Sequence, residues 1–404
     1  MFRKLNIFNR LQGMALAIAC GFVFVFASCS KGSDVPEPRR TSERAVLVYM
    51  VASNSLGSYK YDDNDISEML AAARAGDLLN GSLLIYHQSY SGSPVLKEVT
   101  ATGIDTLKIY DNSVSSLSVA RMKGVIGDVK ATIPAKDYGI ILWSHGNGWL
   151  RAGEGHTGET PIGRAFGQEG GIDGVTRYMD TESLAQALTG TGLSFAYFDC
   201  CYMGGVEVLY DMKGAVPKIV ASVAELPAAG MPYNITLPYL MAPGKADLEG
   251  AAKATFDFYD SKTGVDRTCT MSVYDMEGMD ELTDAVKELY AWHPVTPANF
   301  TPQKFMTEWK CYHYDFKHYV ENLQLPGTND DEQLQAFEST REKVLAAIER
   351  VVTYSEATPF IWDKLAVRHH CGISTQFLTD EAGSTTQGYQ ETAWWRDVAS
   401  QLFE

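Results

Sequence analysis

The sequence predicts an α/β protein built on a mainly parallel sheet with helices on both faces. Short continuous apolar runs, such as Ala45–Val51, are typical of strands buried on both faces. Segments with apolar residues three and four positions apart separate these runs and indicate helices. This alternation favours parallel strands joined by crossover helices. With 45% hydrophobic and 21% charged residues, the composition is that of a globular protein.

The first 28 residues carry the features of an export signal. Basic residues at 3, 4 and 10 precede an apolar segment, Met14–Phe26, and the sequence FASC follows at 26–29. This pattern is similar to a bacterial lipoprotein signal, in which Cys29 would be lipidated and become the first residue of the mature chain. A plain signal peptide and an N-terminal membrane helix are the alternatives, although the apolar run is short for a span of about 20 residues.

Lipidation of Cys29 would attach the chain to a lipid bilayer of the cell envelope, at the outer membrane or the cell surface. Residues 29–44 are then a flexible tether, because they are rich in Lys, Gly, Ser and Pro without periodicity. An α/β core is expected over 45–245 and a C-terminal α/β extension over 246–404. The net charge of −16 disfavours nucleic acid as a partner and is compatible with a basic peptide.

The expected elements of the core follow one another regularly. Strands are predicted at 45–51, 82–86, 106–110, 138–143, 195–198 and 217–222, with the 106–110 strand at an edge. Helices are predicted at 66–73, 113–129, after a cap at Asp180 or Thr181, and at 204–212. The acidic segment Tyr61–Asp65 is interpreted as a solvated helix N-terminus, since it lacks the ligand spacing of an EF-hand.

The remaining segments are less regular. Residues 150–178 are Gly-rich and polar, which predicts a long exposed loop without core residues. The C-terminal half is expected to contain helices at 246–260, 277–292 and 330–352, a strand at 269–274, and a strand and a helix within 365–378 and 389–402. This half either extends the sheet or packs as a second subdomain.

Five of the seven cysteines lie outside the export signal, at positions 200, 201, 269, 311 and 371. An odd number with wide spacing does not indicate a disulfide framework, and the absence of a CxxC motif gives no support to a structural zinc site. At least one thiol is therefore free. A free thiol in an exported protein is a candidate nucleophile when a suitable histidine accompanies it.

Cys201 and His145 each follow a predicted strand, where a doubly wound sheet presents its chemistry. A helix beginning after Cys201 would lower the pKa of its thiol. The backbone N–H groups of Gly146 and Cys201 are candidate donors to an oxyanion. Strand alternation places Asp199 and Cys201 on one side and Cys200 on the other, so Cys201 is favoured over Cys200 as the nucleophile. The histidines at 87, 293, 313, 318, 369 and 370 are interpreted as structural.

The segments WSHGNGW, at 143–149, and FDCCYMG, at 198–204, resemble the paired motifs of the clostripain-like cysteine peptidases. Further similarity lies in VYMVASNSL, in IVAS with Glu225, and in GMPY, CGISTQFL and TAWWRDV. The resemblance implies a caspase-like αβα fold and cleavage of peptide bonds after basic residues. It also implies that Cys201 is the nucleophile, His145 the general base, and Asp199 an acid of the pocket for the basic side chain.

The chain departs from this family at Ala229-Gly230-Met231, where Asp-Gly-Trp is usual and its Asp forms part of the same pocket. A strict arginine preference is therefore not implied. The family also suggests self-cleavage between the two motifs, for which Arg151, Arg164 and Arg177 are candidate sites and an uncut loop the alternative. Calcium dependence is common in the family, but no ligands are assigned and the chemistry needs no cofactor.

The sequence is thus expected to encode an exported, lipid-anchored cysteine endopeptidase. The alternative is a catalytically inactive surface lipoprotein that has kept the fold as a binding protein.

Overall fold

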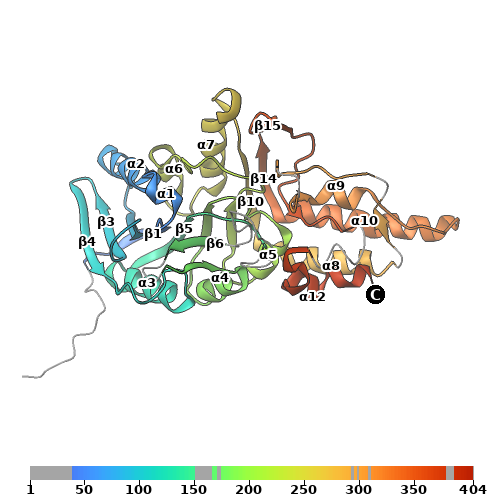
Figure 1. The fold of residues 1–404 in the computed structure, drawn as a ribbon, viewed down its shortest axis with the longest axis horizontal. Coiled ribbons are helices and arrows are strands. Elements are labelled where there is room, and N and C mark those ends of the chain that lie inside the picture. Colours follow the sequence, from blue (N-terminus) through green and yellow to red (C-terminus); the bar gives the residue numbers. More distant parts are fainter. Residues whose placement is uncertain are drawn as a thin grey trace, which may run out of the picture. The chain divides into compact units, whose positions relative to one another are not determined.

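A nine-stranded sheet is the central element of the computed structural model (Figure 1). The structure describes residues 39–150, 166–170, 174–292, 295–297, 300–307, 311–378 and 386–403. Across the sheet the strands are β14 (Val352–Ala357), β10 (Thr270–Asp275), β9 (Lys218–Ala221), β8 (Phe195–Asp199), β5 (Ala135–Trp143), β1 (Ser42–Val51), β2 (Ser82–Gln88), β3 (Val95–Thr100) and β4 (Gly103–Ile109).

The predicted mainly parallel sheet is confirmed at its centre. The pairs β9–β8, β8–β5, β5–β1 and β1–β2 are all parallel. At both sides the sheet continues with antiparallel strands, β3 and β4 at one side and β10 and β14 at the other. Because β10 and β14 come from the C-terminal half, that half extends the sheet, and the described residues from 39 onward form one compact unit.

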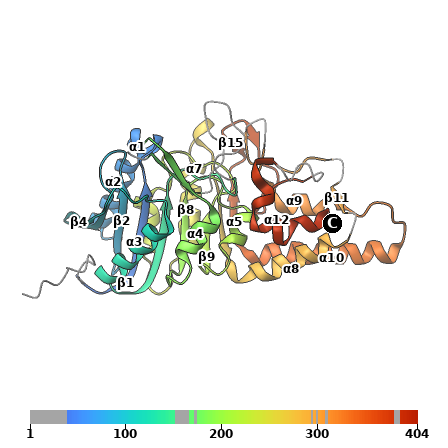
Figure 2. The same ribbon diagram turned by 60° about the horizontal axis from the view of Figure 1, so that its bottom comes forward.

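Helices cover both faces, and alternate residues of each strand point to one or the other. On one face, apolar residues pack with α2 (Tyr61–Ala75), α6 (Tyr233–Leu240) and α7 (Leu248–Asp260). On the other face they pack with α3 (Val119–Thr132), α4 (Thr181–Leu188), α5 (Val206–Asp211), α8 (Met279–Tyr290), α9 (Phe316–Glu321), α10 (Asp331–Val351) and α12 (Ala393–Asp397), part of which Figure 2 brings forward. The molecule therefore has the predicted three-layer arrangement.

Several short elements lie outside the central sheet. They are α1 (Ser55–Ser58), the strand pairs β6 (Phe166–Gly170) with β7 (Thr176–Met179), β11 (Thr296–Pro297) with β13 (Leu323–Gln324), β12 (Tyr314–Asp315) with β17 (Ser374–Thr375) and β15 (Phe360–Ile361) with β16 (Leu365–Ala366), and 3₁₀ turns at Gly264–Asp266, Met276–Gly278, Thr386–Glu391 and Ala399–Leu402. Within the described ranges, no helix is both long and apolar enough to span a bilayer.

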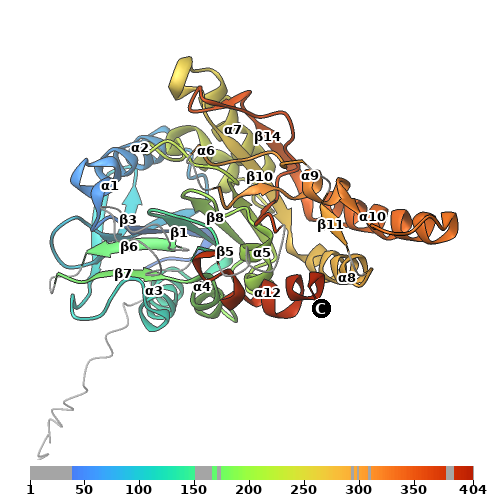
Figure 3. The same cartoon turned by 45° about the vertical axis from the view of Figure 1, so that its right-hand side comes forward.

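The prediction of a structureless loop over 150–178 is wrong for its described part. Strands β6 and β7 form an antiparallel hairpin, which Figure 3 shows beside β1 and β5. Leu150 and Phe166 are fully buried in the same core cluster as α3 and α4. These two buried side chains attach this part of the chain to the core. The segment is otherwise dominated by glycine and polar residues, so its composition does not indicate that it packs there.

The predicted tether also ends earlier than residue 44, because Ser42 already belongs to β1. Arg44 is buried, and its guanidinium donates to Asp137 at 2.6 Å and to the carbonyls of Leu240, Ala242 and Gly244 at 2.6–3.0 Å. A buried charge is tolerated when it is paired and its donors are satisfied. Arg44 therefore fixes the start of β1 instead of belonging to a mobile linker.

Candidate active site

The two predicted catalytic residues lie at the same edge of the sheet. In the parallel pairing of β5 with β8, Trp143 lies opposite Asp199. His145 and Cys201 each follow two residues after that pair, so matched register brings them out side by side at the carboxyl ends of their strands. The structure thus brings together two segments that the sequence separates by 56 positions (201 − 145).

Gly146 lies directly against the segment that carries both cysteines. A Cβ atom at this position would lie 2.5 Å from the carbonyl oxygen of Cys201 and 2.9 Å from Sγ of Cys200. The hairpin fixes the same segment, because the N–H of Gly167 donates to the carbonyl of His145 at 2.8 Å. Only glycine allows the histidine and cysteine segments to approach this closely.

The Cys201 side chain is half-buried and contacts the segment between β9 and α6. The N–H of Leu226 donates to its Sγ at 3.4 Å. Burial, followed by the nearby charge of Glu225, raises the pKa of the Cys201 thiol to about 12. The expectation that a helix N-terminus lowers this pKa is wrong, since α5 begins only at Val206 with Gly205 as its N-cap. In this arrangement the thiol is protonated at neutral pH.

Cys200 has the buried position that strand alternation predicts. It is in the core cluster that contains Phe198, and burial raises the pKa of its thiol well above the usual value. Next to the thiols, the Tyr202 backbone adopts the left-handed region with φ +63°, and its ring stacks on the buried ring of His313 at 4.6 Å between centroids. This stacking supports the turn that follows Cys201.

Asp199 is almost fully enclosed, with 4% of its surface exposed. Its Oδ1 accepts from the N–H of Met231 at 2.8 Å, and its Oδ2 accepts from the hydroxyl of Tyr233 at 2.9 Å. A Cβ on Gly230 would lie 2.8 Å from Oδ1, so the stretch where the family pattern carries an additional acid does lie against Asp199. Burial raises the pKa of Asp199 to about 7. Strand β8 ends at Asp199, so the predicted alternation does not extend to Cys201, whose side chain packs against the core cluster that also contains Cys200.

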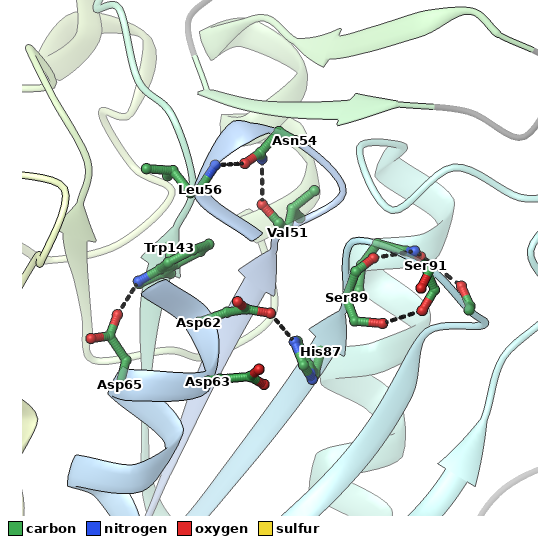
Figure 4. A network of polar contacts seen from close by, with 12 residues as sticks. Val51, Asn54, Leu56, Asp62, Asp63, Asp65, His87, Ser89, Ser91 and Trp143 are labelled. Atoms are coloured by element: carbon green, nitrogen blue, oxygen red, sulfur yellow. Dashed lines mark hydrogen bonds and ion pairs between the residues drawn. The ribbon is translucent and has the colours of Figure 1, made fainter. Parts of the chain in front are cut away.

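Helix α2 carries two buried acids, and their burial was not predicted from the sequence. Asp62 and Asp65 are only 3% and 2% exposed, so the interpretation of this segment as solvated is wrong for both. In Figure 4, Asp62 pairs with Nε2 of His87 at 2.7 Å, and Nε1 of Trp143 donates to Asp65 at 2.6 Å. Burial and the neighbouring Asp199 raise the pKa of Asp65 to about 9. Their spacing of three residues on one helix face was the available signal.

Ser55 is a second residue that the sequence analysis missed. It opens α1, immediately after β1, and its Oγ lies 2.8 Å from Nε2 of His145. No local pattern connects the two residues, which lie 90 positions apart.

The remaining predicted positions are either outside the described residues or in the hairpin. Cys29, Arg151 and Arg164 lie outside the described residues, whereas Arg177 is in β7, paired opposite Glu169. Within the described part of the chain, no group of three or more His, Cys, Asp or Glu side chains has an arrangement that could hold a metal ion. No calcium ligands are therefore assigned.

Comparisons with known proteins agree with the fold and with the family resemblance. The model of the clostripain family, peptidase family C11, matches residues 48–399. A secreted C11 cysteine protease from Bacteroides thetaiotaomicron, "iotapain", has 23% identity and a TM-score of 0.72, over 90% of this chain and 99% of that one. A C11 protease from Parabacteroides distasonis, described as an inactive zymogen, has 25% identity and a TM-score of 0.71, over 89% and 98%.

A structure of a secreted C11 cysteine protease from Bacteroides thetaiotaomicron with an irreversible peptide inhibitor has 22% identity and a TM-score of 0.71, over 90% of this chain and 99% of that one. A search among curated proteins gave no match.

Proposed function

Because the chain belongs to the clostripain family of cysteine peptidases, we propose that Cys201 and His145 are the nucleophile and the general base with which it hydrolyses peptide bonds. The observation that carries this assignment is the parallel register of β5 and β8, which brings both residues to one edge of the sheet. The close contact of Gly146 with Cys201 supports a shared oxyanion site formed by their two N–H groups.

The reaction then follows the usual sequence for a thiol nucleophile. His145 takes the proton of Cys201, and Sγ attacks the scissile carbonyl while the N–H groups of Gly146 and Cys201 stabilise the oxyanion. The C–N bond breaks as the His145 imidazolium protonates the leaving amine, which leaves a thioester. Water, deprotonated by His145, hydrolyses the thioester, releases the carboxylic acid and restores the thiol.

The described conformation has the properties of a resting form. The thiol of Cys201 has a raised pKa, and the carboxylate of Asp199 is occupied by groups of its own chain. Activation would therefore require the segment around Met231 and Tyr233 to move away from Asp199. One of the similar structures, with 25% identity, is likewise described as an inactive zymogen.

A preference for substrates with a basic side chain before the scissile bond is part of the proposal. Although Ala229 stands where the family carries a second acid, Glu68 of α2 lies close enough to Asp199 for its charge to contribute to the raised pKa of Asp199. Such a pair of carboxylates attracts a cation. Because the second acid is replaced, both Arg and Lys are expected to be accepted.

A library of peptides that differ only in the residue before the scissile bond tests activity and specificity together. Cleavage after Arg and Lys by the wild type, abolished in Cys201→Ala, is the expected result. Preferential cleavage after acidic or apolar residues would refute the assignment of Asp199. Labelling of Cys201 by an electrophilic peptide probe separates the peptidase from an inactive binding lipoprotein, which would not be labelled after reduction and addition of calcium.

Export and lipid anchoring rest on residues 1–29. The lipoprotein-like sequence at 26–29 supports attachment of a lipid to Cys29, which would hold the peptidase at the cell envelope. Incorporation of a labelled fatty acid, lost in Cys29→Ala, is expected. A cleaved but unlabelled wild-type chain would indicate a plain signal peptide instead.

Self-processing is proposed within residues 150–165. Arg177 is a poor candidate, because it is paired within the hairpin and a protease needs an extended, accessible segment. Intact-mass measurements should show two fragments for the wild type and one chain for Cys201→Ala, with the cut after Arg151 or Arg164. Equal masses after incubation with calcium would contradict self-processing.

A further inference from the structure

We propose that Ser55 is a positioning residue for His145, which rests on the proposed role of His145 as the general base. The Oγ of Ser55 lies 2.8 Å from Nε2 of His145. A catalytic imidazole transfers a proton through one nitrogen, while the hydrogen bond at the other fixes its tautomer and ring orientation. With Nε2 directed to Ser55, Nδ1 is the nitrogen that exchanges protons with the thiol and the leaving amine.

The tautomer follows from this assignment. To accept the thiol proton, Nδ1 must carry a lone pair, so the proton of the neutral ring is on Nε2. Nε2–H then donates to the Ser55 hydroxyl oxygen, and the same bond persists when Nδ1 is protonated. The hydroxyl therefore holds the ring in one orientation throughout the cycle, without contacting the reacting atoms.

The position of Ser55 is itself built by a buried side chain. Asn54 accepts at Oδ1 from the N–H of Leu56 and donates from Nδ2 to the carbonyls of Val51 and Gln168 at 2.8–2.9 Å. Figure 4 shows this amide between the end of β1 and the first turn of α1. One buried amide thus connects β1, α1 and the hairpin strand β6.

The same network reaches the residue before His145. The hydroxyl of Ser144 donates to the Val51 carbonyl at 2.8 Å and accepts from the N–H of Gln168 at 3.2 Å. Both partners of the Ser55–His145 hydrogen bond are therefore held by one set of contacts. Such support is what a positioning hydrogen bond requires, because a mobile hydroxyl would not restrict the ring.

The α1 turn offers a matched control. Ser58 is exposed like Ser55 and lies on the same short helix, but its Oγ donates to the backbone carbonyl of Ser55 at 2.8 Å. Ser55→Ala and Ser58→Ala each remove one exposed hydroxyl from the same four-residue helix. Only the first removes the contact with the imidazole.

The test measures kcat and KM for a peptide cleaved after Arg, together with the rate at which iodoacetamide alkylates Cys201. A single hydrogen bond is worth about 1 kcal/mol, so Ser55→Ala should lower kcat roughly 3- to 10-fold while KM stays unchanged. Alkylation should slow by a similar factor, because a misoriented His145 accepts the thiol proton less well. Ser55→Thr, which keeps the hydroxyl, should restore both rates, and Ser58→Ala should match the wild type.

Ser55→Ala with wild-type kcat and alkylation rate, or an equal loss in Ser58→Ala, would overturn the positioning role. A loss that Ser55→Thr does not restore would overturn it as well. The two proposals fail separately: a wild type that cleaves no peptide refutes the proposed function, whereas the alkylation rates of the serine variants report on His145 without turnover.

Discussion

Gly146 has no room for a side chain, which makes it a sharp single-residue test of the site. In Gly146→Ala the new methyl group would meet the carbonyl oxygen of Cys201 at 2.5 Å. Separation of the two segments would displace both proposed oxyanion donors, so kcat/KM should fall about 100-fold. Crowding should also lower the free energy of unfolding by about 1–3 kcal/mol.

Peptide cleavage assays and urea unfolding measure both effects. Gly124→Ala is a suitable control, because a Cβ at this exposed glycine would meet nothing within 4 Å. Unchanged activity in Gly146→Ala would contradict the role of this segment.

The site residues that were predicted from the sequence all lie at the ends of recognisable apolar strands. His145, Cys201 and Asp199 follow strands whose apolar composition is readable, so their position at a sheet edge could be derived. Ser55 could not be found in this way, because its link to His145 depends on how β1 and β5 align, and no local pattern encodes that. The burial of Asp65 was equally hidden, since its partners belong to β5 and β8.

At the scale of the elements, α3 contains two glycines that the packing does not require. Gly124 and Gly127 are exposed, and a Cβ at either would meet nothing within 4 Å. Because glycine inside a helix costs backbone entropy, Gly124→Ala and Gly127→Ala should each stabilise the protein by about 0.5–1 kcal/mol.

Thermal or urea unfolding of the single and double variants measures these gains. Additive increases with wild-type activity are expected, because both glycines are exposed and a Cβ at either meets nothing within 4 Å. A lower melting temperature in either variant would mean that the glycine has a structural role that the helix geometry does not reveal.

The elements that were predicted correctly are those whose signals lie within their own segment of the sequence. Helix α10 was predicted almost to its ends, because its apolar spacing and the Asp330 cap are local features. Strand β3 was missed, since the charged residues Lys97 and Glu98 interrupt its apolar pattern. Glu98 is nevertheless buried, because Arg39 and Arg40 pair with it from 59 and 58 positions away, and no sequence window contains that pairing.

For the whole molecule, buried acids should set the response of stability to pH. The pKa of Asp65 is raised to about 9, so above pH 6.5 the folded state still holds a proton that the unfolded state has released. Stability must then decrease as pH rises, by the linkage between proton binding and folding. The pKa of Asp199, raised to about 7, adds to the decrease at the lower end of this range.

Asp65→Asn should remove much of this decrease, because its amide stays neutral and keeps an oxygen for Trp143. Urea unfolding at about pH 6.5, 7.5 and 8.5 should show a flatter profile than the wild type. Asp63→Asn, an exposed neighbour on the same helix, is the control and should leave the profile unchanged. A wild-type profile without slope would show that Asp65 is ionised in the folded protein.

The central sheet draws its strands from both sides of the segment at 151–165. Strands β1 to β5 precede that segment and β8, β9, β10 and β14 follow it. The two groups of strands meet where β5 pairs with β8. A severed chain would therefore remain one particle, held by ladder hydrogen bonds and a shared core. Two separately expressed polypeptides, ending at 150 and beginning at 166, should co-elute and reconstitute peptidase activity, as a split enzyme does.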